Sequence, residues 1–206
     1  IGDLKYDVSF NATKFNEIWA NNPAESLESK KNPYTRTTQQ TNYYGVMYHS
    51  LGFFKDAQDV YNSAKPINSS NLTAGDIKYE DVNGDGVIDG SDNRRVGSGS
   101  FPLVNYGFNI NLGYKGFAFS TLFQGATKFD FYLGETLRMA SAQSGTVPMY
   151  SFQKDYWTPT NTNARFPRLI SQTSINNNNN NLSSDFWLIN GAYLRMKDIR
   201  ISYDLK

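Results

Sequence analysis

Two neighbouring segments that alternate between apolar and polar residues constrain this chain more than any other feature. From Val104 to Tyr114 every second residue is apolar or aromatic, and the residues between them are Asn or Gly. The same rhythm resumes at Phe117, after the dipeptide Lys115-Gly116. A period of two indicates a β-strand with one apolar and one polar face, and a two-residue link that contains Gly is typical of a hairpin turn. The sequence therefore predicts an antiparallel hairpin here.

Two further segments alternate in the same way. Residues 4–12 place Leu4, Tyr6, Val8 and Phe10 on one side of a strand. In residues 193–205, one register holds Tyr193, Arg195, Lys197, Ile199, Ile201, Tyr203 and Leu205. With aromatic residues at 15% of the chain, these patterns predict an all-β fold of antiparallel strands.

Strand length and loop length bear on the class of β-protein. Segment 104–114 has the roughly 9–11 residues with which a tilted strand crosses a bilayer, and Tyr106 and Tyr114 lie toward its ends like an aromatic girdle. An exposed strand of a soluble β-sandwich would show the same alternation. The connections 51–100 and 127–190 are long, whereas Lys115-Gly116 is short. This asymmetry favours part of a transmembrane β-barrel with long extracellular loops.

Composition excludes several classes of function. The 206 residues carry 20 basic and 19 acidic side chains, and this balance does not suggest a nucleic-acid partner. Cysteine is absent, so disulfides and thiolate chemistry are excluded. No apolar run approaches the roughly 20 residues of a transmembrane helix. The sequence has a single histidine, His49, and lacks both a nucleophile elbow and a phosphate-binding loop, so we do not expect an enzyme.

The segment from Asp81 to Asp92 (DVNGDGVIDGSD) resembles a calcium-binding loop of the EF-hand type. Calcium prefers carboxylate and carbonyl oxygens, and the sequence supplies them at each ligand position of such a loop. The predicted ligands are Asp81, Asn83, Asp85, the carbonyl of Val87, Asp89 and Asp92.

The surroundings of the calcium loop depart from those of an EF-hand. Gly86 lies where the loop turns sharply, and Ile88 can pack inward. The last ligand is Asp where EF-hands have Glu, and residues 76–80 read as a short strand where an EF-hand has a helix. We expect a structural Ca²⁺ site between strands. The alternative is an Asp- and Asn-rich turn that binds no metal.

Three other segments allow more modest predictions. A cluster of Tyr156, Trp157, Arg165 and Arg168 could contact a ligand or partner, or could simply pack against the rest of the protein. Residues 13–42 are polar and irregular, with a possible helical turn over Phe15–Ala20. The run of Asn from 176 to 181 predicts a solvated loop tip.

Several motifs, in this order and spacing, resemble SusC/RagA-type TonB-dependent receptors of Bacteroidota outer membranes. They are YYG through GFF (43–54), AGDIKYEDVNGDG (74–86), YKGFAFSTLFQG (114–125), YWTP with NARFPR (156–168) and FWL with GAYLR (186–195). The resemblance implies that residues 1–206 are a late part of the receptor's β-barrel domain. The plug, the N-terminal domain that reaches TonB and the last strands would lie outside this chain.

The resemblance also implies a function. It suggests TonB-dependent import of glycans, oligosaccharides or peptides across a bacterial outer membrane, with a SusD-like lipoprotein as the lid. By strand parity, the calcium loop and segment 127–190 would face the outside of the cell. A soluble, calcium-stabilised surface module that binds carbohydrate is the alternative.

Overall fold

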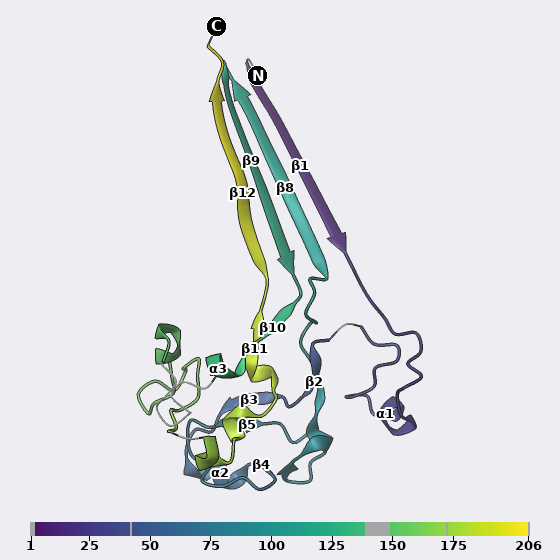
Figure 1. The fold of residues 1–206 in the computed structure, drawn as a ribbon, viewed down its shortest axis with the longest axis vertical. Helices are drawn as coiled ribbons and strands as arrows, with labels where there is room; N and C mark the ends of the chain where they lie inside the picture. The colour runs from purple at the N-terminus through teal and green to yellow at the C-terminus, as the bar shows by residue number, and fades with distance from the viewer. Residues whose placement is uncertain (1–2, 42, 139–148, 172, 206) are drawn as a thin grey trace.

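The computed structural model describes residues 3–41, 43–138, 149–171 and 173–205, and consists of a long β-sheet with a larger assembly at one end (Figure 1). We call the described part of residues 43–103 and 128–192 the lobe, and residues 15–41 the arm. Both chain termini lie at the end of the long sheet that is remote from the lobe. The two long connections therefore emerge on the same side, opposite the short turn at Lys115-Gly116.

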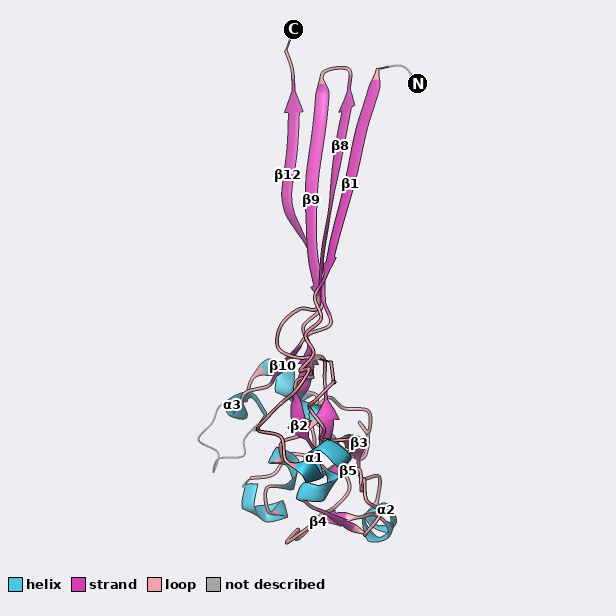
Figure 2. Ribbon diagram, turned by 90° about the vertical axis from the view of Figure 1, so that its right-hand side faces the viewer, coloured by secondary structure: helices cyan, strands magenta, loops and turns pink. Residues whose placement is uncertain are grey.

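The long sheet has the strand order β1-β8-β9-β12, and all its neighbouring strands are antiparallel. Its strands, each of 11 residues, are β1 (Leu4–Lys14), β8 (Val104–Tyr114), β9 (Phe117–Thr127) and β12 (Tyr193–Tyr203). Between β8 and β9, Lys115 has a φ of 46° and Gly116 a φ of 86°, as a tight hairpin turn requires. The predicted hairpin is confirmed. Figure 2 shows the strands of this sheet side by side in a narrow, elongated arrangement.

The register gathers the apolar side chains of all four strands on one face, because paired residues of antiparallel strands point to the same side. Phe10 pairs with Phe108, which pairs with Phe123, and the rings of Phe108 and Phe123 stack with centroids 4.6 Å apart. The apolar face continues through Tyr6, Val8, Ile110, Leu112, Phe117, Phe119, Leu194, Met196, Ile199, Ile201 and Tyr203.

No described residue covers this apolar face. Tyr6, Val8, Phe10 and Ile201 are between 63% and 75% exposed. The opposite face carries polar, charged and small residues, among them Lys5, Asp7, Asn11, Asn105, Asn109, Asn111, Ser120, Gln124, Arg195, Asp198 and Arg200. The sheet thus separates an apolar exterior from a polar side, which is the property that the alternation predicted.

A β-bulge corrects the predicted register of the last strand. Met196 pairs with Phe123, but the next paired residue is Asp198, so Lys197 is an extra residue in β12. An extra residue in a strand shifts the alternation by one, so side chains on its two sides follow opposite registers. The strict alternation that placed Arg195 with Ile199 is therefore wrong. Leu194 and Met196 occupy the apolar face, and Arg195 lies on the polar one.

The lobe is assembled from short elements. Its helices are α2 (Ala57–Asn62) and α3 (Glu135–Arg138), and its strands are β2 (Gly45–Met47), β3 (Ser50–Phe53), β4 (Lys65–Pro66), β5 (Ile77–Tyr79), β6 (Val87–Ile88), β7 (Arg94–Val96), β10 (Asp130–Tyr132) and β11 (Leu188–Asn190). These strands form the pairs β10-β11, β2-β7, β3-β5 and β4-β6. Short 3₁₀ helices cover residues 90–92, 151–154, 173–176, 179–181 and 185–187.

An aromatic core holds the two parts of the lobe together. Ile77, Tyr79 and Ile88 from the first long connection pack with Phe166 and Trp187 from the second. Tyr48, Phe53, Tyr132, Tyr156 and Phe186 surround this cluster. Removal of aromatic surface from water favours this arrangement. The lobe is therefore a folded unit, not a pair of independent loops.

The arm contains the helix α1 (Leu27–Lys31). Ser26 caps its N-terminus, and the Ser26 hydroxyl accepts a hydrogen bond from the Ser29 amide. The helical turn predicted over Phe15–Ala20 is wrong. Instead, Ile18 forms an isolated antiparallel bridge with Thr41. Among the described residues, no helix is both long enough and apolar enough to span a membrane.

The prediction of a solvated loop tip for the Asn run holds only in part. Asn177 and Asn178 are exposed and have left-handed φ values of 50° and 59°, but three of the other Asn side chains are buried. Asn176, Asn179 and Asn180 are 4% exposed or less. The Asn180 side-chain oxygen accepts from the Ile77 amide (2.9 Å), and the Asn179 side chain donates to the Ile77 carbonyl (2.8 Å). Side-chain amides carry the same donor and acceptor groups as the backbone, so these two residues pair with β5 much as a neighbouring strand would.

Candidate functional site in the lobe

The predicted calcium loop, residues 81–92, is organised by hydrogen bonds from its own backbone to its side-chain oxygens. Asp81 accepts from the amides of Gly84 (2.7 Å) and Gly86 (2.8 Å). Asn83 accepts from the Asp85 amide (3.0 Å). Gly84 and Gly86 have φ values of 76° and 85°, in the left-handed region that favours glycine. The glycines thus let the chain wrap around the side chain of Asp81.

Asp92 closes the loop from within the protein. It is fully buried, and its two oxygens accept from the amides of Val82 and Asp89, both at 2.8 Å. Asp89 in turn accepts from the Ser91 amide at 2.7 Å. The last predicted ligand therefore also fixes the ends of the loop to each other.

The loop is anchored in the core through Ile88, which is 1% exposed, as its apolar character predicted. The strand β6 that contains Ile88 pairs in parallel with β4. The segment before the loop forms the predicted short strand, β5. Nearby, burial and the negative charges of Asp89 and Asp92 raise the pKa of the Tyr48 hydroxyl.

The side chains at the predicted ligand positions are of the chemical type that calcium prefers, but the structure does not gather them as a ligand set. All side chains at the predicted positions are carboxylates or an amide, and the carbonyl of Val87 follows in sequence. The carboxylates accept hydrogen bonds from backbone amides. In the described part of the chain, no group of three or more acidic or histidine side chains lies close enough together to hold a metal ion. Carboxylate oxygens have further lone pairs beyond those that such bonds use.

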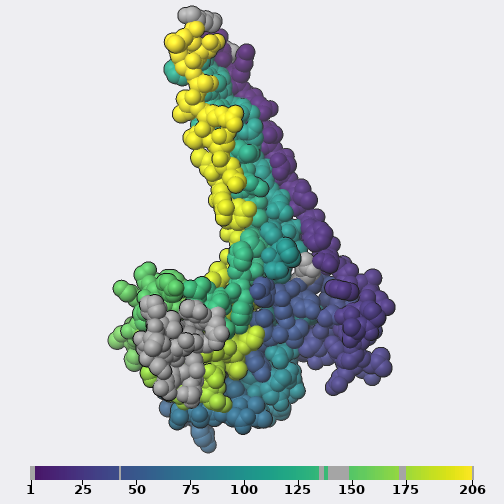
Figure 3. Space-filling model, viewed as in Figure 1, coloured from purple at the N-terminus to yellow at the C-terminus, as the bar shows by residue number. Residues whose placement is uncertain are grey.

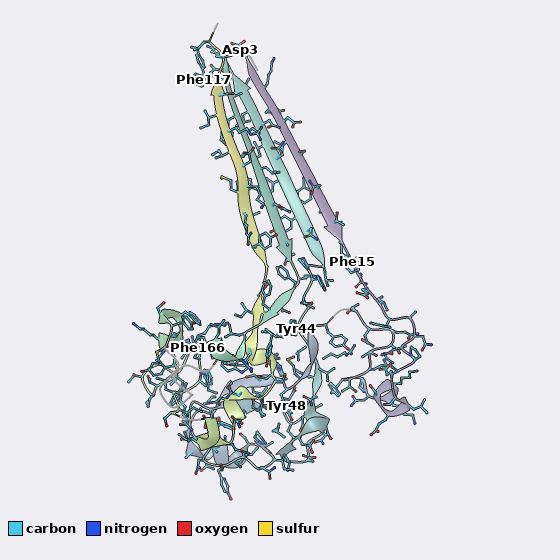
Figure 4. The ribbon with its side chains drawn as sticks, in the orientation of Figure 1. Asp3, Phe15, Tyr44, Tyr48, Phe117 and Phe166 are labelled. Atoms are coloured by element: carbon cyan, nitrogen blue, oxygen red, sulfur yellow. The ribbon has the colours of Figure 1, made fainter. Side chains whose placement is uncertain are left out.

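The segment that contains Tyr156 and Trp157 packs closely against the residues just before β5. The Trp157 ring covers Gly75, where an added Cβ would lie only 2.4 Å from it. Tyr156 forms an isolated bridge with Phe166 and borders the core. Figure 4 shows Phe166 and Tyr48 within the lobe, far from Phe117 at the end of the long sheet. Two of the four predicted contact residues are thus built into the lobe itself.

The two arginines of this segment differ. Arg168 donates from Nε (2.9 Å) and Nη2 (3.1 Å) to the two oxygens of Asp76, which is fully buried. Arg165 is exposed. Asn176 and Asn180 also donate to Asp76, both at 2.9 Å. We call Asp76, Arg168, Asn176 and Asn180 the polar node. Contact of Tyr156, Trp157, Arg165 or Arg168 with a ligand or partner remains a prediction.

Sequence reasoning did not identify Asp76, because an acidic residue at the start of a short strand has no distinctive signal. It also did not identify a cleft between the arm and the lobe, lined by His49, Asp185, Arg94 and Arg95 among others. Adjacent arginines were the available signal for this second site. The charge balance of this cleft, however, depends on ion pairs between residues that are distant in sequence, which adjacent arginines do not reveal.

No family model matches the chain. The chain is similar to TonB-dependent receptor P26 of Formosa agariphila, with 30% identity over 151 residues. That match covers 70% of this chain and 14% of the relative. TonB-dependent receptor P3 of the same organism is 28% identical over 129 residues, or 62% of this chain and 12% of the relative. The chain thus spans a small fraction of the curated relatives that it matches.

Among solved structures, the RagAB peptide transporter is similar over 98% of this chain and 21% of its own, with a TM-score of 0.58 and 14% identity. The RagAB peptide importer in the open-open state gives a TM-score of 0.53 at 15% identity, covering 98% of this chain and 20% of its own. These comparisons confirm the resemblance to TonB-dependent receptors and the antiparallel all-β fold. The homologues are receptors and transporters, which are not enzymes.

Proposed function

We propose that this chain forms part of the wall and the outer lobe of a receptor that imports nutrients across a bacterial outer membrane, with energy delivered through TonB. The observation that carries the proposal is the uncovered apolar face on a sheet of 11-residue strands, with a polar face behind it. Such a face suits lipid on one side and a wet lumen on the other. A soluble module would need a second sheet over it.

The cargo and partner belong to the same proposal. By analogy with SusC/RagA-type receptors of Bacteroidota, we expect a glycan, an oligosaccharide or a peptide as cargo. The peptide alternative is supported by the similarity to the RagAB complex, which is a peptide transporter. A SusD-like lipoprotein would close over the lobe, and the contact with TonB would lie in another part of the receptor.

Surface labelling tests the topology. In the full-length receptor, freed of other cysteines, Tyr61→Cys places a thiol on the lobe, where Tyr61 is 77% exposed. Lys115→Cys places one in the turn at the opposite end of the sheet. We expect a membrane-impermeant maleimide to label the Tyr61 variant in intact cells, and the Lys115 variant only after permeabilisation. The reverse pattern would reject the proposed orientation.

Uptake assays test the activity and the cargo. Cells that express the receptor are given labelled oligosaccharides or labelled peptides, with and without a functional TonB. We expect TonB-dependent uptake of one of the two classes, and the class that enters identifies the cargo. Uptake that continues unchanged without TonB would contradict the mechanism.

We further propose that the calcium loop binds Ca²⁺ through Asp81, Asn83, Asp85, the Val87 carbonyl, Asp89 and Asp92. The support is the donor set, the turn around Asp81 and the anchored Ile88. Calcium would offset repulsion among the carboxylates and stiffen the lobe. The ion would act on the structure of the lobe and only indirectly on transport.

Calorimetry with the purified receptor measures this binding directly. We expect Ca²⁺ to bind and to raise the unfolding temperature of the lobe, and Asp85→Asn to weaken both effects. Asp204→Asn, an exposed substitution outside the loop, is the matched control. An unchanged unfolding temperature after chelation, together with no heat of binding, would reject the site.

A further inference from the structure

An open cleft of about 380 Å³ lies between the arm and the lobe. Pro33 and Tyr34 of the arm form one wall, and β7 with Gly97 forms another. His49 and Asp185 complete the lining. The volume falls in the range of about 300–1,000 Å³ that small-molecule sites occupy. Figure 3 shows the arm in contact with this side of the lobe.

Two of the three basic side chains in the cleft are matched by carboxylates. Arg94 Nη1 lies 2.8 Å from a carboxylate oxygen of Glu80. His49 forms a short contact through Nδ1 with Asp185, whose other oxygen accepts from the Ser50 amide at 2.8 Å. The Arg94–Glu80 ion pair therefore contributes little net charge to the cleft.

Arg95 is different, because among the described residues no carboxylate pairs with it. Its Nη2 donates to the Pro33 carbonyl at 2.8 Å, and its Nε approaches the Tyr34 carbonyl at 3.4 Å. The guanidinium also lies 5.9 Å from the centre of the Tyr43 ring. Carbonyls and an aromatic ring orient a guanidinium but leave its charge in place.

The cleft thus presents a pre-oriented cation with N–H groups that these bonds do not use. A guanidinium pairs best with a planar anion that accepts two parallel hydrogen bonds. Tyr34, which is 45% exposed, lines the same cleft. The geometry points to a binding site for the carboxylate of a small ligand, with Arg95 as its recognition residue. The carboxylate could belong to a uronic acid or to the C-terminus of a peptide.

This inference rests on the proposed import function, since it names the chemical class of cargo. It is tested by calorimetry on the full-length receptor in detergent, with four probes: galacturonate, neutral galactose, the dipeptide Ala-Leu and its C-terminal amide. We expect at least one carboxylated probe to bind about tenfold or more tightly than its neutral counterpart, as a charged hydrogen bond provides. The pair that shows the difference identifies the source of the carboxylate.

Variants assign the preference to the cleft. Arg95→Gln should abolish it, Arg95→Lys should keep part of it, and Arg200→Gln, an exposed arginine on the long sheet, should leave it unchanged. The inference is overturned if neither carboxylated probe is preferred, or if Arg95→Gln keeps the preference. TonB-dependent uptake that persists in that case would leave the import function standing and reject only the carboxylate site.

Discussion

The long sheet and the lobe join at the ends of the same strands, but they are stabilised in different ways. In the long sheet, the environment of each side chain follows from its place in a simple alternation, and the apolar side chains point away from the protein. In the lobe, burial depends on partners far apart in the sequence, such as Asp76 and Asn180, which are separated by 104 residues. The apolar face of the long sheet is not covered by any described residue, whereas the lobe buries its apolar side chains against one another.

The largest expected effect is in the polar node. Arg168→Leu should lower the free energy of unfolding of the lobe by about 3–5 kcal/mol, because it leaves a buried carboxylate without its cation. Hydrogen exchange of residues 73–80 in the full-length receptor measures this change. Arg165→Leu, at an exposed position, should stay within about 0.5 kcal/mol. Equal effects of the two substitutions would show that the node does not hold the lobe together.

A charge on the apolar face tests the other side of the comparison. Phe108→Arg should destabilise the receptor in lipid by about 2–4 kcal/mol, because the side chain would face hydrocarbon near the middle of the membrane. Asn109→Arg, one residue along on the polar face, should change stability little. Folding into lipid vesicles at increasing urea concentration gives both values. The lipid-facing assignment fails if Asn109→Arg is the more harmful substitution.

Asn180→Ala should have a smaller effect, about 1–3 kcal/mol, because it removes the acceptor of the buried Ile77 amide and one donor to Asp76. The matched control is Asn181→Ala, in the same run but half-buried. Hydrogen exchange of the Ile77 amide reports the change. If Asn180 behaves like Asn181, the run contributes no specific pairing.

The smallest expected effect concerns the arm. Desolvation raises the pKa of Glu25, but hydrogen bonds from the Thr38 hydroxyl and from the amides of Thr37 and Thr38 outweigh it and lower the pKa to about 2. A lowered pKa means that the stabilisation is complete above the ordinary value of 4.5 and is lost as the pH falls toward about 2. Protection of the Thr37 and Thr38 amides, corrected for intrinsic exchange, should decrease over that range.

Glu25→Gln is the control for this pH dependence. It should remove most of the protection at pH 7 and leave little further dependence on pH. Protection that is equal in both proteins at every pH would contradict a role for the carboxylate.

Much of the long sheet was predictable because alternation is a local property. The bounds of β8 and the turn at Lys115-Gly116 follow directly from the residue pattern. The bulge at Lys197 was not predictable in this way. A strict period of two assigns Arg195 to the apolar face, and only pairing with β9 reveals the extra residue.

The candidate site was predictable only in part. The ligand types of the calcium loop and the inward position of Ile88 could be read from spacing. The burial of Asn176, Asn179 and Asn180 could not, because Asn by itself favours exposed turns. It depends on the polar groups of β5 and Asp76, which these side chains satisfy only after the two long connections have come together.

The Asn run also has a consequence for how the folding chain finds its alignment. Six consecutive identical side chains mean that a shift by one residue places another amide at nearly every contact. Amide chemistry alone therefore cannot distinguish the native alignment from its neighbours. The distinction must come from groups that are not repeated, such as the Trp187 indole, which donates to the Asn180 carbonyl (3.1 Å), and Leu182 beside the core. The lobe thus uses a chemically uniform segment whose alignment is determined by the residues around it.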